Sequence, residues 1–332
     1  MNAVSSSIAV TVTVAVPARL HLGFLDLNGG LGRRFGGIGL AIDGLRTKLT
    51  IAKASQPRIE GPDRERAAHY LETMRHLLAL PGSYHLQVDE AIPPHAGLGS
   101  GTQIALAIAA GLRRLHDLPL DVENDAIRLG RGARSGVGIG LFHRGGIVVD
   151  AGHGPATKIA PVVSHMSFPP QWRVLLLLDP ARRGVHGLDE NVAFAGLPPF
   201  PDHIAAHLCR LVLMQALPAV AEYDLARFGS AIRELQAQVG DYFAPRQGGR
   251  FSSPAVGAGL DLLDREGAHG IGQSSWGPTG FAFAASPEDA HRLANVVRNH
   301  PDCRGLDIRV CAALNRGADI KAHAAAGAPA QH

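Results

Sequence analysis

The chain has 332 residues, of which 46% are hydrophobic and 18% charged, and its 32 basic and 29 acidic residues leave a net charge of +3. This composition is typical of a folded globular protein and excludes an extended disordered chain. The small net charge, without a cluster of basic residues, argues against nucleic acid as a partner. The length predicts about two domains, because domains average about 150 residues.

Cysteine usage and hydropathy favour a cytoplasmic protein. Cys209, Cys303 and Cys311 are widely spaced and form no C-x-x-C pair, which argues against a disulfide framework and a zinc site. The N-terminus lacks a charged start followed by an apolar segment, so we expect no signal peptide. No apolar stretch approaches the roughly 20 residues that a membrane helix needs. We therefore expect a cytoplasmic chain with no membrane partner.

Hydrophobic patterns predict strands and helices in the first half of the chain. Strands are indicated by alternating, β-branched residues, and helices by apolar residues that recur at helical spacing. The predicted strands are residues 8–16, 45–52, 83–90 and 145–150. The predicted helices are residues 64–79, 102–115 and 121–131.

The second half of the chain also contains both strands and helices, and a boundary between two lobes is indicated before it. Its predicted strands are residues 172–178, 270–272, 281–284 and 305–313, and its predicted helices are residues 202–217, 222–239, 254–266 and 287–299. Prolines between 155 and 170 mark the boundary, so we expect an N-terminal lobe at 1–160 and a C-terminal lobe at 161–322. The alanine-rich tail 323–332 is expected to be disordered. Because strands and helices mix without regular βαβ alternation, the predicted fold class is α+β.

The segment 97–102, Gly-Leu-Gly-Ser-Gly-Thr, is the clearest local signal of a binding site. It follows a Pro-Pro pair and runs straight into the helix at 102–115. Glycine lets the backbone approach a ligand closely, and the N–H groups that begin a helix attract anions. The spacing matches neither a Walker loop nor a Rossmann fingerprint. The alternative is a plain tight turn with Thr102 as the helix N-cap. The residues expected to bind phosphate are His95, Gly97, Leu98, Gly99, Ser100, Gly101, Thr102 and Gln103.

Residues 94–102 resemble the second motif of the GHMP kinases, Pro-x-x-x-Gly-Leu-Gly-Ser-Ser-Ala. Residues 17–20 are similar to an early strand of those kinases, and the glycine-rich segment 273–280 is similar to their third motif. The resemblance implies a two-lobed GHMP-kinase-like fold. Its N-terminal lobe would be like ribosomal protein S5, and its C-terminal lobe would be a ferredoxin-like α/β lobe.

One position departs from the kinase pattern. Many GHMP kinases carry Ser-Gly-x-Asp in mid-chain, where the Asp activates the substrate hydroxyl. The corresponding residues 135–138 read Ser-Gly-Val-Gly, so Gly138 stands in place of the acid. Glycine cannot accept a proton, and the usual catalytic base is therefore missing. This departure argues against phosphoryl transfer from ATP.

A narrower resemblance rests on five segments that occur in order. They are residues 19–26, 93–103, 134–140, 145–153 and 273–279. Together they are similar to the β-ribofuranosylaminobenzene 5′-phosphate synthases, a family with the same fold. The resemblance implies that phosphoribosyl pyrophosphate reacts with 4-aminobenzoate or 4-hydroxybenzoate, with Mg²⁺ and without ATP. The products would be a C-riboside 5′-phosphate, CO2 and pyrophosphate, in an early step of tetrahydromethanopterin biosynthesis.

That chemistry requires charged groups around the anomeric carbon of the ribose. The expected catalytic residues are Arg19, His21, Asp26, Arg134 and Asp150. Arg19 and His21 alternate with leucines and so share one face of a strand. Asp26 either binds Mg²⁺ or ribose, or it caps a turn. Asp150 either takes part in acid–base or metal chemistry, or it makes a structural hydrogen bond.

Arginine suits the 5′-phosphate and the benzoate carboxylate because its planar fork matches both groups, and tryptophan can stack on the benzoate ring. The expected substrate-binding residues are Ser135, Arg182, Arg183, Gln273, Ser274, Ser275 and Trp276. His186 and Glu190 are weaker candidates near the two arginines. We also predict that Gly99→Val damages activity with little loss of fold, because a β-branched side chain would crowd the phosphate.

Two other functions fit the same motifs. One is an ATP-dependent GHMP kinase of a small alcohol, with Asp26 or Asp150 as its base, and the other is a non-catalytic protein that binds a phosphorylated metabolite. The kinase would form ADP, whereas the binding protein would be stabilised by its ligand without turnover. The sequence leaves open the preferred benzoate, the Mg²⁺ ligands and the acid or base. A homodimer is the commonest expectation for the oligomeric state.

Overall fold

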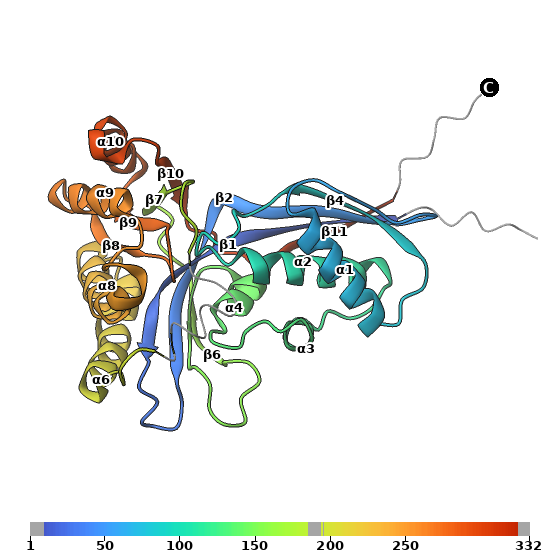
Figure 1. Ribbon diagram of the computed structural model, residues 1–332, viewed down its shortest axis with the longest axis horizontal. Coiled ribbons are helices and arrows are strands. Elements are labelled where there is room, and N and C mark those ends of the chain that lie inside the picture. Colours follow the sequence, from blue (N-terminus) through green and yellow to red (C-terminus); the bar gives the residue numbers. More distant parts are fainter. Residues whose placement is uncertain (1–9, 185–193, 195, 325–332) are drawn as a thin grey trace, which may run out of the picture.

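The computed structural model describes residues 10–184, 194 and 196–324, which form two β-sheets with helices packed on both (Figure 1). The first sheet has seven strands, in the order β11-β1-β2-β4-β3, with β5 paired to β2 and β6 paired to β5. The second sheet has four strands, in the order β10-β7-β9-β8. The α+β fold class is confirmed.

A long antiparallel hairpin forms the centre of the first sheet. It consists of β1 (Val10–Asp26) and β2 (Phe35–Ala54). The start of β1 alternates between partly exposed and buried residues, as its β-branched pattern predicts. Register shifts at Pro17/Ala18 and His21/Gly23 interrupt the β1–β2 pairing. Such irregularities bend a strand, and here they lie in the part of β1 that carries Arg19 and His21.

The other strands of the first sheet pair with different parts of this hairpin. The strand β4 (Ser83–Glu90) pairs with the second half of β2, and β5 (Ile147–Asp150) pairs with its first half. The remaining strands are β3 (Arg58–Glu60), β6 (Val162–Met166) and β11 (Asp319–Ala324).

Four helices belong to the first lobe. They are α1 (Arg64–Leu77), α2 (Ser100–Leu115), α3 (Val122–Arg128) and α4 (Val137–Arg144). The helix α2 is buried along almost its whole length and contacts β1, β2 and α1. Its first turn, rather than its middle, is the part that can meet a ligand.

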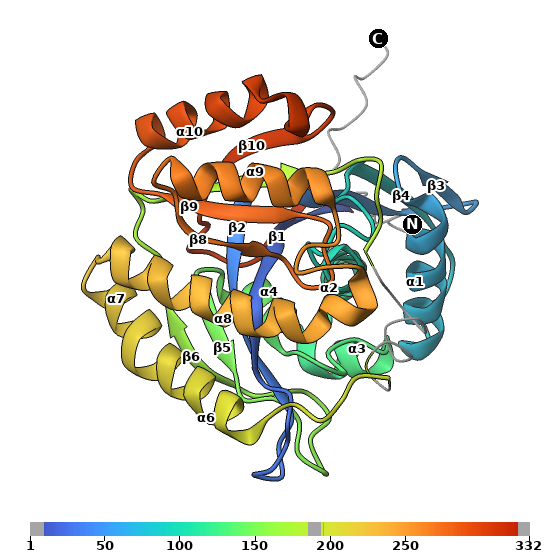
Figure 2. The same cartoon turned by 60° about the vertical axis from the view of Figure 1, so that its left-hand side comes forward.

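Helices α8 (Leu225–Gln247), α9 (Pro254–Arg265) and α10 (Pro287–Asn299) pack against the second sheet. Its strands are β7 (Arg173–Leu178), β8 (His269–Gln273), β9 (Gly280–Ala284) and β10 (Asp307–Ala312). Figure 2 shows α9 and α10 lying beside this sheet, with α8 below them. The helix α8 contacts both β8 and β1, and so joins the two lobes. The largest apolar core accordingly mixes residues from both sheets, such as Leu22, Leu176 and Phe283.

A continuous helical run precedes α8. It comprises α6 (Asp202–Leu211), the π-helix η1 (Val212–Ala216) and α7 (Leu217–Ala221). By length and composition this run could cross a membrane, so the expectation that no apolar stretch approached that length is wrong. The physical reason for the apolar pattern is packing, because Leu208 and Val220 belong to the main core.

The two sheets do not divide the chain at one residue. The strand β6 follows residue 160 but pairs with β5, and β11 returns from the end of the chain to pair with β1. Residues 323 and 324 lie in β11, although they fall in the tail that was expected to be disordered, while residues 325–332 lie outside the described residues. The elements α4, β3, β6 and β11 were missed, because each has only three to eight residues, too few to show a clear period.

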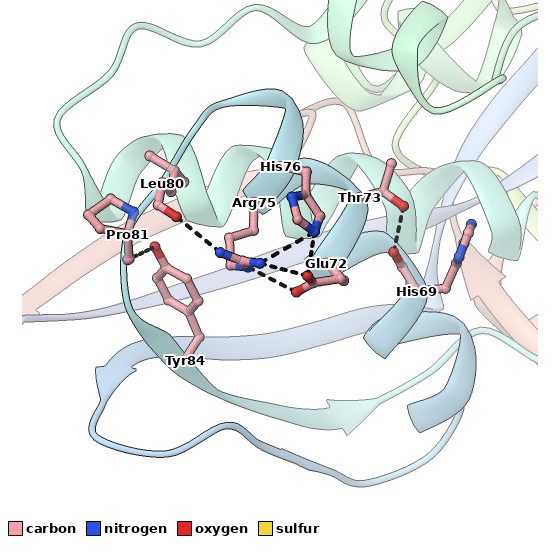
Figure 3. Close-up of polar contacts among 8 residues, drawn as sticks. All are labelled: His69, Glu72, Thr73, Arg75, His76, Leu80, Pro81 and Tyr84. Atoms are coloured by element: carbon pink, nitrogen blue, oxygen red, sulfur yellow. Dashed lines mark hydrogen bonds and ion pairs between the residues drawn. The ribbon is translucent and has the colours of Figure 1, made fainter.

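The surface of α1 carries a polar network around Glu72 and Arg75 (Figure 3). Two nitrogens of Arg75 donate to the carboxylate of Glu72, at 2.9 and 2.7 Å, and Nε2 of His76 lies 2.7 Å from Oε1 of Glu72. His69 and His76 are both exposed, as are His203 and His207. All four of these histidines lie on the surface.

Candidate active site

The glycine segment forms a turn that leads directly into α2. Three of its residues have positive φ angles: His95 at 58°, Gly97 at 77° and Gly99 at 76°. Gly99 is the helix N-cap, and no side chain caps the helix, so the alternative in which Thr102 caps it is wrong. The first turn of an α-helix has N–H groups without intrahelical partners, and these can bind an anion. We call residues 97–101 the glycine cradle.

The cradle packs against the loop that follows β8. Ser274 Oγ donates to the carbonyl oxygen of Gly97 at 2.7 Å and accepts from the backbone N–H of His21 at 2.9 Å. A Cβ atom on Gly97 would lie 2.1 Å from the carbonyl oxygen of Ser274, so glycine is required for this approach. Ser274 therefore joins three segments that are distant in sequence.

Arg19 lies against the inner side of the cradle. Its backbone N–H donates to the carbonyl oxygen of Leu98 at 3.0 Å, and its Nη1 donates to that of Gly97 at 3.5 Å. Its Nε would lie 3.1 Å from a Cβ atom on Gly99. The expected phosphate-binding turn and the expected catalytic arginine are thus in contact.

Two further arginines, which the sequence reasoning missed, flank the start of α2. A Cβ atom on Gly101 would lie 3.2 Å from Nη1 of Arg131 and 3.6 Å from Nη1 of Arg66. Arg66 pairs with Asp63 and also donates to Ser100 Oγ at 3.3 Å. The only sequence signal was weak, since Arg131 stands between two glycines while Arg66 looks like any charged residue of a surface helix.

The environment of Arg131 indicates an anion site. Its guanidinium lies over the ring of Tyr70 and bonds the hydroxyl of that residue, yet its buried Nε has no partner among the described residues. Burial, with a smaller contribution from the charge of Arg66, lowers the pKa of Arg131. Two cations beside the positive end of a helix repel one another, and a bound anion would offset that repulsion.

Aromatic rings gather next to the cradle, around Phe24 of β1. The ring of Phe24 lies 4.7 Å from that of His21 and 6.4 Å from that of Phe243, and Phe243 lies 4.3 Å from Trp276. Phe194 and Phe35 complete this group, which we call the aromatic cluster. A small hollow of about 20 Å³ is lined by His21, Phe24, Phe243, Gln273 and Ser275, among others. Trp276 is buried within the cluster and contributes to its packing.

Ser135 lies near His21, because a Cβ atom on Gly37 would lie 3.0 Å from Nε2 of His21 and 3.4 Å from Oγ of Ser135. Asp150 is fully buried and accepts hydrogen bonds from Ser135 Oγ at 2.9 Å and from the N–H groups of Gly136, Val137 and Gly152. Burial raises the pKa of Asp150, and these hydrogen bonds act against that rise. Both carboxylate oxygens are already occupied, so the geometry favours the structural alternative, in which Asp150 positions Ser135 and the start of α4.

The other expected catalytic residues lie in different surroundings. Arg134 precedes Ser135, and its guanidinium lies over the ring of Phe194 at 5.8 Å. Asp26 accepts hydrogen bonds from the N–H groups of Asn28 and Gly29, both at 2.8 Å, and so caps the turn of the β1–β2 hairpin. It follows His21 by five residues of extended strand, about 16 Å, which separates it from the cradle.

The loop after β7 reaches the cradle from the second lobe. The N–H of Gly184 donates to the carbonyl oxygen of His95 at 2.8 Å. Arg182 and Arg183 are exposed on this loop, and Nη1 of Arg182 donates to the carbonyl oxygen of Ser252 at 3.0 Å. His186 and Glu190 lie outside the described residues.

Gln273, Gln103 and Gly138 make the next contacts around the site. Gln273 Oε1 accepts from the N–H and the hydroxyl of Ser252, so this glutamine holds the loop in place. Gln103 is fully buried and donates to the carbonyl oxygen of Gly138 at 3.0 Å. A Cβ atom on Gly138 would lie 3.4 Å from Thr102, so the position of the kinase acid does face the start of α2.

The residues described by the structure contain no group of three or more His, Cys, Asp or Glu side chains that could hold a metal ion. Asp63, the carboxylate beside the cradle, is already paired with Arg66. These side chains therefore do not form a metal cage.

The chain is similar to known proteins in sequence family and in fold. The GHMP kinases N terminal domain family matches residues 65–142, and the GHMP kinases C terminal family matches residues 216–303. The homoserine kinase of Cytophaga hutchinsonii has the same fold, with a TM-score of 0.70 at 15% identity, and the alignment covers 97% of this chain and 100% of that one.

Two curated relatives are more similar in sequence. The β-ribofuranosylphenol 5′-phosphate synthase of Methanothermobacter thermautotrophicus is 31% identical, over 87% of this chain and 92% of its own length. The enzyme of the same name from Archaeoglobus fulgidus is 32% identical, over 92% of this chain and 98% of its own length. The resemblance seen in the sequence is therefore confirmed, and the chain is an enzyme of the β-ribofuranosylphenol 5′-phosphate synthase family with the GHMP-kinase fold.

Proposed function

We propose that this enzyme transfers ribose 5-phosphate from phosphoribosyl pyrophosphate to the carboxyl-bearing carbon of 4-aminobenzoate or 4-hydroxybenzoate. CO2 and pyrophosphate leave, and the product is a β-ribofuranosyl arene 5′-phosphate. The observation that carries the proposal is the contact between an anion cradle and an aromatic cluster, joined through Ser274. A sugar pyrophosphate and an aromatic acid require these two environments side by side.

The cradle and its arginines would hold the pyrophosphate. Arg19, Arg66 and Arg131 approach residues 97–101 from different sides, and the N–H groups at the start of α2 add donors. Negative charge grows on the pyrophosphate as its bond to the anomeric carbon breaks, so donors fixed in advance favour departure. When bound, Mg²⁺ would neutralise part of this charge, and we propose that it enters with the pyrophosphate of the substrate.

The aromatic cluster would hold the benzoate beside the anomeric carbon. Arg134, which lies over Phe194, is the cation that we propose for the carboxylate. Arg182 and Arg183, on the loop that contacts His95, are proposed for the 5′-phosphate. Loss of CO2 is favoured when a carboxylate is moved from water into apolar surroundings. The chemistry therefore depends on positioning more than on a covalent intermediate.

The relatives are named for a ribofuranosylphenol, which favours the hydroxyl acid as the acceptor. We propose a place in tetrahydromethanopterin biosynthesis, a cytoplasmic location and a homodimer as the working assembly. The absence of a carboxylate at Gly138 supports a synthase over a GHMP kinase.

The test is to incubate the protein with Mg²⁺, phosphoribosyl pyrophosphate and carboxyl-labelled 4-aminobenzoate or 4-hydroxybenzoate. Labelled CO2 and stoichiometric pyrophosphate are expected from at least one acid. Formation of ADP from ATP and a small alcohol, without CO2, would instead identify a kinase. Stabilisation by phosphoribosyl pyrophosphate without turnover of either acid would identify a binding protein.

A further inference from the structure

One face of α1 lies at the start of α2, where the two arginines flank the cradle. Arg66 and Tyr70 are four residues apart and so share a face of α1, and Asp63 is the N-cap of that helix. The helix packs against α2 (Figure 1). Arg66 pairs with Asp63 and donates to Ser100 Oγ at 3.3 Å, which places this face beside the first turn of α2.

Tyr70 holds the guanidinium of Arg131 in two ways. The guanidinium carbon lies 5.2 Å from the centre of the Tyr70 ring, and Nη2 of Arg131 donates to the Tyr70 hydroxyl. The face of the ring attracts the cation, while the hydroxyl fixes the direction in which the planar guanidinium lies. Tyr70 is only 2% exposed and belongs to the apolar core of the first lobe. Arg131 therefore has a rigid support.

The rest of the Arg131 guanidinium is left for a ligand. Its Nη1 would lie 3.2 Å from a Cβ atom on Gly101, so it is in contact with the first turn of α2. Its Nε is buried and has no hydrogen-bond partner among the described residues. A buried donor without a partner is costly, and a bound anion would satisfy it.

The two arginines beside α2 are held by partners of different charge. Asp63 is a carboxylate, so its pairing with Arg66 offsets the charge of that arginine. Tyr70 is a neutral phenol and leaves the charge of Arg131 uncompensated. In the described part of the chain, Arg131 forms no ion pair with a carboxylate. A fixed, partly buried cation of this kind attracts a phosphate more strongly than a solvated one.

We propose that Tyr70 is a positioning residue, which holds Arg131 against the start of α2 so that the pyrophosphate meets a cation already in place. This inference rests on the proposed function. Tyr70 acts through Arg131. A free arginine side chain loses conformational entropy when it binds an anion, and support from Tyr70 reduces that loss. A donor held in advance also stabilises the charge that grows on the leaving pyrophosphate.

Tyr70→Phe tests the hydroxyl while keeping the ring and its packing. The Kd of inorganic pyrophosphate, measured by isothermal titration of the full chain with Mg²⁺ present, should rise about 3- to 10-fold. In turnover, kcat/KM for phosphoribosyl pyrophosphate should fall by at least the same factor. A purely structural role would lower the fraction of folded protein, and so the number of binding sites, without changing Kd. A wild-type Kd in Tyr70→Phe would overturn the proposal.

Tyr84→Phe is the matched control. Tyr84 is also 2% exposed, and its hydroxyl bonds Nε2 of His116 at 2.8 Å. His116 follows the last residue of α2, about 22 Å along the helix from Gly101. The control thus removes a buried tyrosine hydroxyl from a basic partner at the other end of the same helix. Its Kd for pyrophosphate should equal that of wild type.

A double variant shows whether Tyr70 acts through Arg131. In the Arg131→Gln background, Tyr70→Phe should change Kd by less than about twofold, because the group that it positions is already gone. If the effects of the two substitutions on Kd multiply, Tyr70 acts independently of Arg131 and the proposal is overturned.

Arg131→Lys separates positioning from charge. Lysine keeps the positive charge but lacks the planar fork that lies over Tyr70, so the Kd of pyrophosphate should rise by at least about threefold. A wild-type Kd in Arg131→Lys would mean that charge alone suffices, and would overturn the proposal. If Tyr70→Phe does not fold, the Arg131→Lys result decides.

The titration needs no turnover, so it distinguishes this inference from the proposed function. If wild type releases CO2 from neither acid but Tyr70→Phe weakens pyrophosphate binding, the proposed function fails and the role of Tyr70 in anion binding is supported. If wild type releases CO2 and Tyr70→Phe binds pyrophosphate as wild type does, the inference fails and the proposed function stands. If wild type does not bind pyrophosphate at millimolar concentration, the inference is overturned.

Discussion

Ser274 and Gly97 are 177 positions apart in the chain, yet the hydroxyl of Ser274 donates to the carbonyl oxygen of Gly97 at 2.7 Å. The same hydroxyl accepts the backbone N–H of His21. One buried side chain thus couples the anion cradle of the first lobe to the loop of the second lobe. The site exists only when both lobes are in place.

Ser274→Ala should therefore weaken both the fold and the site. The change leaves the N–H of His21 and the carbonyl of Gly97 without this partner, so the free energy of unfolding should fall by about 1–3 kcal/mol. Urea denaturation measures this loss, and Ser164→Ala on β6 is the control. If Ser274→Ala loses no more free energy of unfolding than the control, the hydrogen bonds of Ser274 contribute nothing to stability.

The cradle itself is best tested at Gly101 rather than at Gly99. Gly99 has a φ of +76°, and its Cβ would meet Arg19 at 3.1 Å, so Gly99→Val would strain the backbone and the prediction of little effect on the fold is wrong. Gly101→Ala keeps an ordinary helical φ and should favour the helix by about 1 kcal/mol. Its methyl group would displace Arg131, so KM for phosphoribosyl pyrophosphate should rise by up to about 10²-fold.

Thermal melting and initial rates together check the Gly101→Ala prediction. A melting temperature at or above that of wild type, with a raised KM, would place the substrate at the start of α2. A wild-type KM would remove residues 97–101 from the pyrophosphate site.

Arg131→Gln should weaken pyrophosphate binding. Loss of a hydrogen bond to a charged group costs about 1.5–3 kcal/mol, which corresponds to about 10- to 150-fold in Kd. Isothermal titration with pyrophosphate measures the change. Arg128→Gln, on the exposed side of α3, removes an equal charge at a nearby position and should change Kd by less than about threefold. Equal effects of the two variants would reduce the role of Arg131 to its net charge.

The network on α1 makes a prediction about pH. Hydrogen bonds from Arg75 lower the pKa of Glu72 from 4.5 to about 2. The folded-state pKa is depressed, so the stabilisation is complete above pH 4.5 and is lost as the pH falls through about 2. Glu72→Gln should lower the melting temperature slightly at neutral pH, because an exposed pair contributes little. The difference in melting temperature between Glu72→Gln and wild type should vanish near pH 2. A difference that does not change with pH would show that the charge of Glu72 is not its cause.

Much of the fold could be predicted because its signals are local. The strand at 83–90 and the helix at 287–299 match β4 and α10 residue for residue, since periodicity and turn residues delimit them. The glycine segment and Ser274 were found through motifs. Arg66 and Arg131 were not found as site residues, because their role depends on neighbours 30 or more positions away. For Asp26 the sequence left two alternatives open, and the hydrogen bonds from Asn28 and Gly29 fit the one in which it caps a turn.

The pairing of β11 with β1 has a consequence for how the protein is made. Val10 aligns with Ala324, so the edge of the first sheet is completed by a strand that is synthesised about 300 residues after β1 begins. Until then, the early strand exposes unpaired backbone groups that can pair with another chain. Nascent protein should thus be most prone to aggregate before β11 has been made, and a fragment that stops at residue 160 should keep that open edge permanently.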